Sequence, residues 1–315
     1  MAKATRVAFG EALKEIGRTH DRVVVLDADL SCSTQTRKFA EAYPERFIEV
    51  GIAEGNMVGV AAGLALAGMV PFAASFACFV VGRFEQIRMS VGYNNANVTI
   101  VGTHAGIGIG EDGYSQMGLE DLALMRSLPN MVVVQPADAI ETVRATEFLA
   151  DYVGPAYLRL TRHSVPDIFD ESYRFDFGKG LELRSGSDVA IVASGAVVAG
   201  AMEAAERLAQ RGIDAAVVNI HTIKPIDEGL LRKLAARCGR IVTVEDHSVV
   251  GGLGSAVVEA LSEVPDVSIR IHGVRSYGES GSQADLYALH GLDAEGIAEV
   301  VADFVGLGGR EKAAG

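Results

Sequence analysis

Cysteine, tryptophan and other aromatic residues are scarce in this sequence. Tryptophan is absent, aromatic residues make up 6% of the 315 positions, and the cysteines are Cys32, Cys78 and Cys238. These thiols lie far apart and show neither a paired spacing nor a metal-ligand pattern, so we expect neither a disulfide framework nor a metal site in this chain. Three unpaired thiols are typical of a protein that works in the reducing cytoplasm.

Positive charge is also in short supply. The chain has 28 Lys and Arg residues against 41 Asp and Glu residues, which gives a formal net charge of -13. Because no run of basic residues interrupts this acidic background, we expect no nucleic-acid partner and no binding to an anionic membrane. The opening residues, Met-Ala-Lys-Ala-Thr-Arg, contain no apolar segment, so we also expect no secretory signal.

One stretch without charged residues, at positions 57–82, is long enough to cross a membrane. It is rich in Gly and Ala rather than Leu, and the run Gly68-Met69-Val70-Pro71 interrupts it. We interpret it as a buried helix, a turn and a buried strand, with a membrane span as the alternative.

Short Val- and Ile-rich runs alternate with helical patterns along the first half of the chain. Strands are expected at 22–26, 47–50, 70–75, 98–102, 131–135 and 156–160, and helices at 6–18, 55–67, 84–92, 119–127 and 138–151. Asp138, followed three residues later by Glu141, is a capping-box pattern at the start of the last helix. Continuously apolar strands joined by helices predict an α/β fold with a mostly parallel sheet, whose ligand sites lie beyond the carboxyl ends of the strands.

The apolar period is lost at 166–187, which we interpret as a linker, and a second, smaller alternation follows. Its strands are expected at 189–193, 215–220, 241–245 and 268–272. The sequence therefore predicts two doubly wound α/β domains, at 1–165 and 188–305, and a frayed tail at 306–315.

Glu54 is a lone carboxylate between an apolar strand and a long helix of small residues. A charged group with apolar walls on both sides is destabilising unless it meets a specific partner. The alternative is an acid in the first turn of a helix, where the helix dipole favours negative charge.

Five segments in fixed order give the chain a resemblance to a known family. They are Gly51-Ile52-Ala53-Glu54, Pro71-Phe72-Ala73-Ala74-Ser75-Phe76-Ala77-Cys78-Phe79, Thr103-His104-Ala105-Gly106-Ile107-Gly108-Ile109-Gly110-Glu111-Asp112-Gly113, Arg126-Ser127-Leu128-Pro129-Asn130, and Asp246-His247-Ser248-Val249-Val250-Gly251-Gly252-Leu253-Gly254. The first four resemble the pyrimidine-binding domain of transketolase and, more loosely, that of 1-deoxyxylulose-5-phosphate synthase. The fifth looks like the transketolase C-terminal domain, and the similarity extends from residue 4 to about residue 305.

The resemblance implies thiamine diphosphate as the cofactor. Glu54 matches the acid that sits beside the pyrimidine ring nitrogen and activates the cofactor. Phe76 and Phe79 match aromatic residues that line the pyrimidine pocket, and Asp29 matches an acid near the cofactor at a subunit interface. The alternatives are that the two phenylalanines belong to the core and that Asp29 only shapes a turn.

The resemblance also implies a substrate site. Arg6, Ser33, His104 and Arg162 match a set that binds the substrate phosphate, and arginine suits phosphate because its planar fork donates two parallel hydrogen bonds. His104 is assigned to the phosphate or to an acceptor hydroxyl, which makes it a second catalytic candidate besides Glu54.

Two further positions concern the sugar itself. Asp112 matches the acid that recognises a sugar hydroxyl, although a turn residue before Gly113 is the alternative. Gln116 stands where the family has a histidine that assists proton transfers on the donor sugar. Because an amide does not titrate, the usual pentose-phosphate donor is in doubt.

The family binds the cofactor diphosphate through a divalent metal, such as Mg²⁺, held by a Gly-Asp-Gly…Asn motif, and this motif is absent from the sequence. The chain therefore resembles the C-terminal half, or beta subunit, of a split transketolase. Its partner would be an N-terminal alpha subunit that holds the metal and the diphosphate, most simply in an α2β2 assembly. The implied reaction is transfer of a two-carbon ketol unit between sugar phosphates.

Several interpretations stay open at this point. The beta subunit of a 2-oxoacid dehydrogenase and an enzyme like 1-deoxyxylulose-5-phosphate synthase are the alternative functions. The loop at Gly251–Gly254 either cradles an anion or permits close helix packing. We expect four other histidines, His20, His221, His247 and His290, to be structural.

Overall fold

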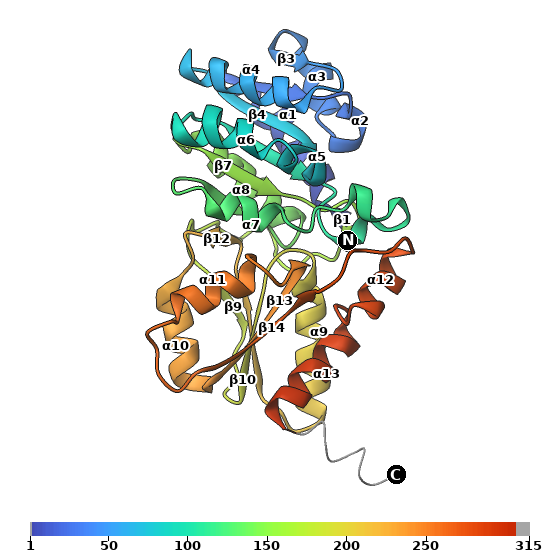
Figure 1. The fold of residues 1–315 in the computed structure, drawn as a ribbon, viewed down its shortest axis with the longest axis vertical. Coiled ribbons are helices and arrows are strands. Elements are labelled where there is room, and N and C mark those ends of the chain that lie inside the picture. Colours follow the sequence, from blue (N-terminus) through green and yellow to red (C-terminus); the bar gives the residue numbers. More distant parts are fainter. Residues whose placement is uncertain (1, 307–315) are drawn as a thin grey trace.

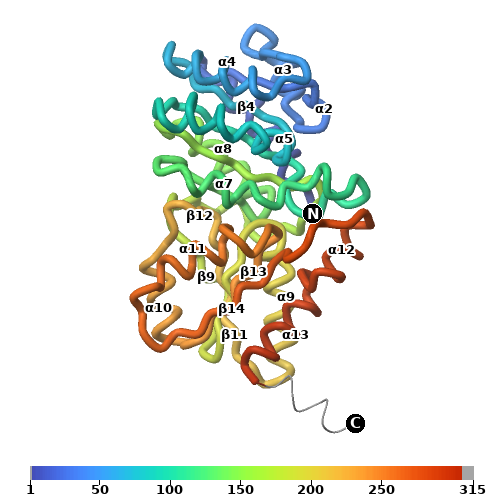
Figure 2. Tube along the Cα trace, in the orientation of Figure 1, coloured from blue at the N-terminus to red at the C-terminus, as the bar shows by residue number. Residues whose placement is uncertain are grey.

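The computed structural model describes residues 2–306 and shows two α/β domains stacked end to end (Figures 1 and 2). The N-terminal domain, blue to green, lies above the C-terminal domain, yellow to red. Gly306 caps the last helix with a positive φ of 95°. The rest of the expected frayed tail, 307–315, lies outside the described residues.

The first sheet has seven strands in the order β12-β6-β7-β5-β4-β2-β3, and all neighbours pair in parallel except β12 and β6. The strands are β2 (Val23–Asp27), β3 (Phe47–Glu49), β4 (Val70–Phe76), β5 (Thr99–Thr103), β6 (Val132–Val134), β7 (Ala156–Arg159) and β12 (Thr222–Lys224). A short antiparallel pair, β1 (Lys3–Ala4) with β8 (Ser164–Val165), lies apart from this sheet. This arrangement confirms the expected mostly parallel sheet.

Helices cover both faces of the first sheet. They are α1 (Thr5–Ile16), α2 (Ser31–Thr34), α3 (Arg37–Ala42), α4 (Glu54–Leu66), α5 (Ala77–Val81), α6 (Phe84–Gln86), α7 (Asp121–Ser127) and α8 (Ala139–Asp151). Short 3₁₀ turns are η1 (Pro44–Arg46), η3 (Ile107–Asp112) and η4 (Tyr114–Gln116), and η2 (Ile87–Tyr93) is a π-helix. The helix expected at 84–92 is thus α6 followed by η2, and the one expected at 119–127 begins at Asp121.

The uncharged stretch at 57–82 folds as interpreted, into most of α4, a turn and the buried strand β4, followed by α5. Between residues 2 and 306, no helix combines the length and the apolar character that crossing a bilayer requires. The capping pattern is also confirmed, because Asp138 Oδ1 accepts from the Glu141 N–H at 2.8 Å. The Glu141 carboxylate reaches back to the N–H of Ala137 at 2.7 Å.

The second sheet has five strands in the order β14-β13-β10-β11-β9. They are β9 (Leu181–Arg184), β10 (Val189–Ala193), β11 (Ala215–Asn219), β13 (Arg240–Ser248) and β14 (Ser268–Val274). The helices are α9 (Val197–Gln210), α10 (Glu228–Cys238), α11 (Leu253–Ala260), α12 (Gln283–Leu289) and α13 (Ala294–Val305). Alternate residues of β10 face opposite sides: Ile191 packs with α9 and α13, whereas Val192 packs with α10 and α11 (Figure 1).

Two strands lie where the sequence pattern did not place them. Within the expected linker at 166–187, β9 pairs antiparallel with β11, so this part of the segment belongs to the second sheet. The short strand β12 follows β11 in the chain but joins the first sheet, beside β6. The chain therefore crosses between the two domains at more than one place.

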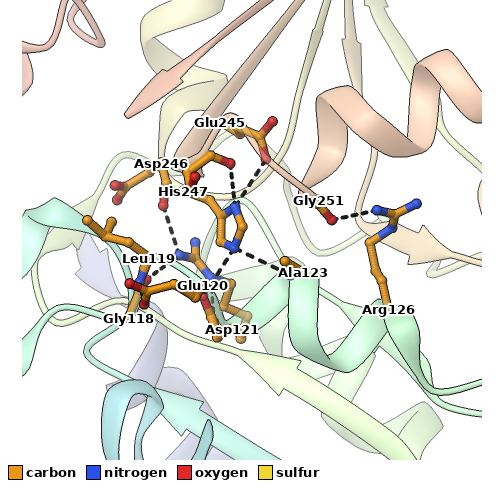
Figure 3. Close-up of polar contacts among 12 residues, drawn as sticks. Gly118, Leu119, Glu120, Asp121, Ala123, Arg126, Glu245, Asp246, His247 and Gly251 are labelled. Atoms are coloured by element: carbon orange, nitrogen blue, oxygen red, sulfur yellow. Dashed lines mark hydrogen bonds and ion pairs between the residues drawn. The ribbon is translucent and has the colours of Figure 1, made fainter. Parts of the chain in front are cut away.

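A buried polar cluster fills the boundary between the domains (Figure 3). Arg159, 1% exposed, donates to Asp121 Oδ2 at 2.8 Å and to the carbonyl oxygens of Gly118 and Asp246. His247 donates from Nδ1 to the Ser248 carbonyl at 2.6 Å, and burial lowers the pKa of this histidine to about 4. His247 is thus a neutral structural group, as expected.

Candidate active site

Most of the candidate residues follow neighbouring strands of the first sheet. Glu54 follows β3, Asp29 follows β2, Phe76 ends β4, His104 follows β5 and Arg162 follows β7. These strands are consecutive neighbours and run in parallel, so their carboxyl ends meet at one edge of the sheet. The fold therefore gathers residues from distant parts of the sequence along one rim.

Glu54 is the first residue of α4 and is only 6% exposed. Its carboxylate forms no hydrogen bond or ion pair with any residue that the structure describes. Glu54 is not among the residues with a fully enclosed, unpartnered side-chain atom, so its carboxylate faces solvent or a ligand at the rim rather than the protein interior. The position of Glu54 therefore fits a ligand that shares a hydrogen bond with this carboxyl group.

The loops after β2 and β3 are tied together by Glu49, a residue that no sequence motif marks. One oxygen of its carboxylate accepts from the N–H of Asp29 at 2.8 Å and from the N–H of Gly51 at 2.9 Å. Asp29 itself is exposed and has a φ of 61°. Its carboxylate projects from a turn on the rim, which leaves the turn role and the cofactor role both open.

Phe76, Phe79 and His104 form one stack. The rings of Phe76 and Phe79 are 5.5 Å apart and nearly parallel, and the His104 ring lies 3.8 Å from that of Phe76. Phe76 is 8% exposed and belongs to a core cluster, whereas Phe79 packs at the edge of that cluster. These residues thus form an apolar wall with a histidine at one end.

His104 has an unusual backbone and a shifted titration. Its φ is 58°, and Nδ1 lies 2.8 Å from the Thr103 hydroxyl. Burial, together with the positive charges of Arg6 and Arg162, lowers the pKa of His104 to about 3. His104 is consequently a neutral imidazole at physiological pH, suited to hydrogen bonding rather than to carrying charge.

Arg6, Ser33, Arg162 and Asp112 are linked to one another. The Arg6 guanidinium donates to the Ser33 carbonyl and, at 3.4 Å, to the Arg162 carbonyl. Arg162 donates to the Ile109 carbonyl at 2.5 Å and lies 3.4 Å from Asp112 Oδ2. Burial and the neighbouring Arg162 hold the pKa of Arg6 below its ordinary value. Two guanidinium groups held this close favour an anion between them.

A cavity of about 370 Å³ opens beside the two arginines. Both domains line it, and its walls include Arg6, Arg162, Glu111, His163 and Gln283. His163, which no motif singles out, is largely buried, and burial lowers its pKa to about 4. The cavity is therefore lined by two cations, one exposed carboxylate and one neutral imidazole.

Gln116 lies in η4, at the end of the loop that begins with His104. Its backbone N–H donates to the Gly113 carbonyl, and its carbonyl accepts from the Cys78 thiol at 3.2 Å. Within residues 2–306 its side-chain amide makes no hydrogen bond. The amide is thus free to contact a ligand, which is consistent with the expected substrate position.

The glycine loop at Gly251–Gly254 does not have room for an external anion. The Glu245 carboxylate already accepts from the N–H groups of Leu253 and Gly254, at 2.6 and 2.8 Å. A Cβ at Gly252 would lie 1.9 Å from Glu245 Oε2. The anion-binding alternative is therefore wrong, and the glycines allow this internal carboxylate to approach.

The structure thus unites two groups of expected residues, the Phe76–Phe79–His104 stack and the Arg6–Ser33–Arg162–Asp112 cluster. Glu54 and Asp29 lie on the same rim but share no hydrogen bond, ion pair or ring contact with either group in the described part of the chain. The roles of all these residues stay predictions.

Comparisons with known proteins cover nearly the whole chain. The family models of the transketolase pyrimidine-binding domain and of the transketolase C-terminal domain match residues 1–167 and 178–297. A putative transketolase C-terminal section from Methanocaldococcus jannaschii is 46% identical over 302 residues, which are 94% of this chain and 95% of that protein.

A subunit of 6-deoxy-6-sulfo-D-fructose transketolase from Clostridium sp. is 42% identical over 294 residues, covering 93% of this chain and 91% of the relative. A solved structure described as "Split gene transketolase, inactive beta4 tetramer" superimposes with a TM-score of 0.90 at 47% identity. It covers 96% of this chain and 99% of its own. All of these matches favour a transketolase over the two alternative functions.

Proposed function

The chain belongs to the transketolase family as one subunit of a split, hetero-oligomeric enzyme, and on this premise we propose that it serves the transfer of a two-carbon ketol unit from a ketose phosphate to an aldose phosphate. The family implies thiamine diphosphate, which, when bound, supplies the carbon nucleophile for this transfer. We place the divalent metal and the diphosphate on the partner subunit, and the enzyme in the cytoplasm.

The observation that carries this proposal is the buried Glu54 carboxylate without a partner in the described chain. Glu54 is the first residue of α4, where the helix N-terminus favours negative charge on a side chain or a bound group. There the Glu54 carboxyl group would share a proton with a ring nitrogen of the bound pyrimidine and so favour protonation of the ring. Phe76 and Phe79 supply the apolar wall that excludes water beside it.

The substrate residues act around this centre. Arg6 and Arg162 hold the phosphate of the sugar, and their attachment to backbone carbonyls fixes the guanidinium planes before the substrate arrives. His104, neutral at physiological pH, hydrogen-bonds the phosphate or an acceptor hydroxyl. Asp112 and Gln116 lie on the same loop as His104 and contact sugar hydroxyls.

The partner subunit docks next to Glu54 on the exposed face of α4. From Asn56 to Leu66 this helix carries no charge, yet Leu66 is 68% exposed, and Ile52 just before the helix is 83% exposed. A Cβ at Gly59 or Gly63 would meet nothing within 4 Å, so the face is flat and open. An exposed apolar helix face of this kind is typical of a protein interface. We propose an α2β2 assembly, which has the two-fold symmetry common among oligomers.

The donor sugar is the least constrained part of the proposal. The Clostridium relative is named for a ketose altered at C6, 6-deoxy-6-sulfo-D-fructose. Gln116, which replaces the family histidine, is consistent with a donor other than the usual pentose phosphate. The two arginines are compatible with any anionic sugar, because sulfonate and phosphate both accept from a guanidinium.

The proposal is tested by reconstitution. The purified chain, given thiamine diphosphate and Mg²⁺, is expected to be inactive and to bind the cofactor poorly, and addition of the alpha subunit should produce ketol transfer. Transfer activity in a preparation shown to contain only this polypeptide would contradict the split active site.

The variant Glu54→Gln, assayed in the reconstituted enzyme, tests the role of the Glu54 carboxylate on which the proposal rests. The fold and the assembly should survive, whereas kcat should fall by about two orders of magnitude or more, because an amide cannot exchange a proton with the pyrimidine ring. The matched control is Glu85→Gln, another first-turn glutamate, which is exposed at the start of α6. If Glu54→Gln exchanges the C2 proton of the cofactor at the wild-type rate, Glu54 is not the activating acid.

A further inference from the structure

The loop that carries His104, Asp112 and Gln116 is closed at its base. A bridge joins Ala105 to Gly118, and the N–H of Gly106 donates to the Gly118 carbonyl at 2.9 Å. We call residues 104–118 the substrate loop. Asp112 and Gln116 lie between the two ends of this closed ring, and His104 directly precedes it.

The substrate loop has little backbone preference of its own. Gly106, Gly110 and Gly113 all have φ between 74° and 85°, and His104 has a φ of 58°. Glycine adopts these positive φ values readily, but it loses more conformational entropy on folding than any other residue. A glycine-rich loop therefore needs contacts from outside to hold one conformation.

Those contacts come from the C-terminal domain. Ile107, Ile109 and Met117 are at most 2% exposed, and they belong to the core cluster that also contains Ile191 of β10 and Tyr287 of α12. The inner side of the substrate loop is thus built into the core of the second domain.

One carboxylate of that domain is bonded directly to the loop backbone. Asp246, on β13 and 1% exposed, accepts from the Ile107 N–H through Oδ1 at 2.8 Å. Its second oxygen, Oδ2, accepts from the Tyr287 hydroxyl at 2.7 Å. Figure 3 shows Asp246 at the boundary between the domains, close to Gly118 and Leu119 at the end of the loop.

The fit between this carboxylate and the loop leaves no spare room. A Cβ at Gly106 would lie 2.0 Å from Asp246 Oδ2, so only glycine allows the approach. The carbonyl of Asp246 also accepts from Arg159, and Arg159 donates in addition to the Gly118 carbonyl. Asp246 therefore binds the start of the substrate loop directly, and it is linked to the end of the loop through Arg159.

We propose that Asp246, oriented by Tyr287, is a positioning residue that sets the substrate loop in its productive shape. This role rests on the proposed function, because it concerns how His104, Asp112 and Gln116 meet the sugar. It assigns the C-terminal domain a part in substrate recognition.

The test compares Asp246→Ala, Tyr287→Phe and Asp246→Asn in the enzyme reconstituted with its alpha subunit. A misplacement of about 1 Å can lower a rate ~100-fold, so Asp246→Ala should raise KM for the sugar phosphates at least about tenfold. Tyr287→Phe, which leaves the Ile107 bond in place, should give a smaller rise. Asp246→Asn keeps an acceptor for Ile107 and should retain most of the wild-type KM.

Exchange of the cofactor C2 proton separates positioning from general damage. This exchange depends on Glu54, which shares no hydrogen bond or ion pair with the substrate loop in the described chain, so it should stay within about twofold of wild type in all three variants. An equal loss of C2 exchange and sugar affinity would overturn the positioning role.

The matched control is Tyr173→Phe. Tyr173 donates to the buried Glu141 carboxylate at 2.6 Å, and Glu141 accepts from the Ala137 N–H at 2.7 Å. This tyrosine–carboxylate–amide chain copies the Tyr287–Asp246–Ile107 chain but does not reach the substrate loop. Tyr173→Phe should therefore leave KM unchanged.

Hydrogen–deuterium exchange of the purified chain provides a readout that does not depend on catalytic activity. Peptides covering 105–118 should exchange at least about tenfold faster in Asp246→Ala and should be unchanged in Tyr173→Phe. Unchanged exchange or unchanged KM in Asp246→Ala overturns the inference. An inactive wild-type complex would instead contradict the proposed function, and the exchange experiment would still decide whether Asp246 anchors the loop.

Discussion

The imidazole ring of His104 lies on the phenyl ring of Phe76, with 3.8 Å between the centroids and 23° between the planes. This contact buries the histidine to 3% exposure at a position where its backbone is already in the left-handed region. With the guanidinium groups of Arg6 and Arg162 nearby, every influence on His104 disfavours its protonated form.

The first prediction concerns stability against pH. The pKa of His104 is about 3 in the folded chain and ordinarily 6.5. Below pH 6.5, His104 is therefore protonated in the unfolded chain but stays neutral in the folded chain. Wild type should therefore lose stability relative to His104→Gln as the pH falls, by on the order of 2 kcal/mol between pH 7.5 and pH 5. Urea denaturation of both proteins at the two pH values measures this difference.

His221→Gln is the control for this measurement. His221 is buried on the chain segment directly before β12 and does not line the candidate cavity, and burial lowers its pKa to about 4. The same trend with pH is expected there, but without any change in KM for sugars. If the stability difference between wild type and His104→Gln does not vary with pH, His104 is not held neutral.

The second prediction concerns the buried ion pair between Arg159 and Asp121. Asp121 is fully buried and accepts from Arg159 and from the Tyr157 hydroxyl, at 2.8 and 2.7 Å. Arg159→Met leaves this carboxylate without its cation, which should reduce the unfolding free energy by ~3–5 kcal/mol. Thermal denaturation measures the loss.

A double variant shows whether the loss comes from the uncompensated charge. Asp121→Leu combined with Arg159→Met removes both charges and should recover much of the stability, because replacing a buried ion pair by apolar residues is often nearly neutral. The surface variant Arg144→Met, which breaks an exposed pair with Glu147, should change stability by less than ~1 kcal/mol. A double variant as unstable as Arg159→Met alone would contradict this explanation.

Local patterns predicted much of the fold. The break at Gly68-Met69-Val70-Pro71 separated α4 from β4, and Asp138 with Glu141 marked the start of α8. The strand β12 escaped prediction because its three residues carry no period and its pairing with β6 depends on the packing of two domains. Similarly, β9 is half-exposed and lacks the continuous apolar run of a central strand.

The candidate site shows the same division. Motif resemblance found the residues at the strand ends, because their local sequence is distinctive. Glu49 and Asp246 were not found as site residues, since their importance depends on which backbone N–H groups they reach in space. Asp246 and Ile107 are 139 positions apart, and no local pattern encodes such a contact.

The third prediction concerns the two arginines. Arg162→Ala, assayed in the reconstituted enzyme, removes a charged donor from the cavity of about 370 Å³. Loss of a charged hydrogen bond is worth ~1.5–3 kcal/mol, so KM for phosphorylated sugars should rise roughly 10- to 150-fold. KM for unphosphorylated analogues should change much less. Arg6→Ala should behave in the same way.

Arg144→Ala is the matched control for the arginine variants. Arg144 lies on α8, pairs with Glu147 at 3.0 Å and does not line the cavity. Neither sugar class should be affected by this change. Equal losses for phosphorylated and unphosphorylated sugars in Arg162→Ala would remove that arginine from phosphate recognition.

The last prediction concerns Gln116, which replaces a histidine of the family. Its amide has no partner among the described residues and cannot relay a proton. The native donor should therefore be a ketose that needs no help at this position, and turnover of xylulose 5-phosphate should be slow. Gln116→His should raise activity on xylulose 5-phosphate and lower it on the native donor, because the imidazole restores a titrating group near neutral pH.

The experiment measures kcat/KM for wild type and Gln116→His, each with the alpha subunit, on a panel of anionic ketoses. Gln116→Asn serves as the control, because it keeps an amide but shortens its reach, and it should lower activity on all donors without reordering them. An unchanged donor ranking between wild type and Gln116→His would mean that another group relays the proton. His104 does not fit that role readily, because its pKa of about 3 lies far below physiological pH. A shift in ranking toward xylulose 5-phosphate would instead place the choice of donor at position 116.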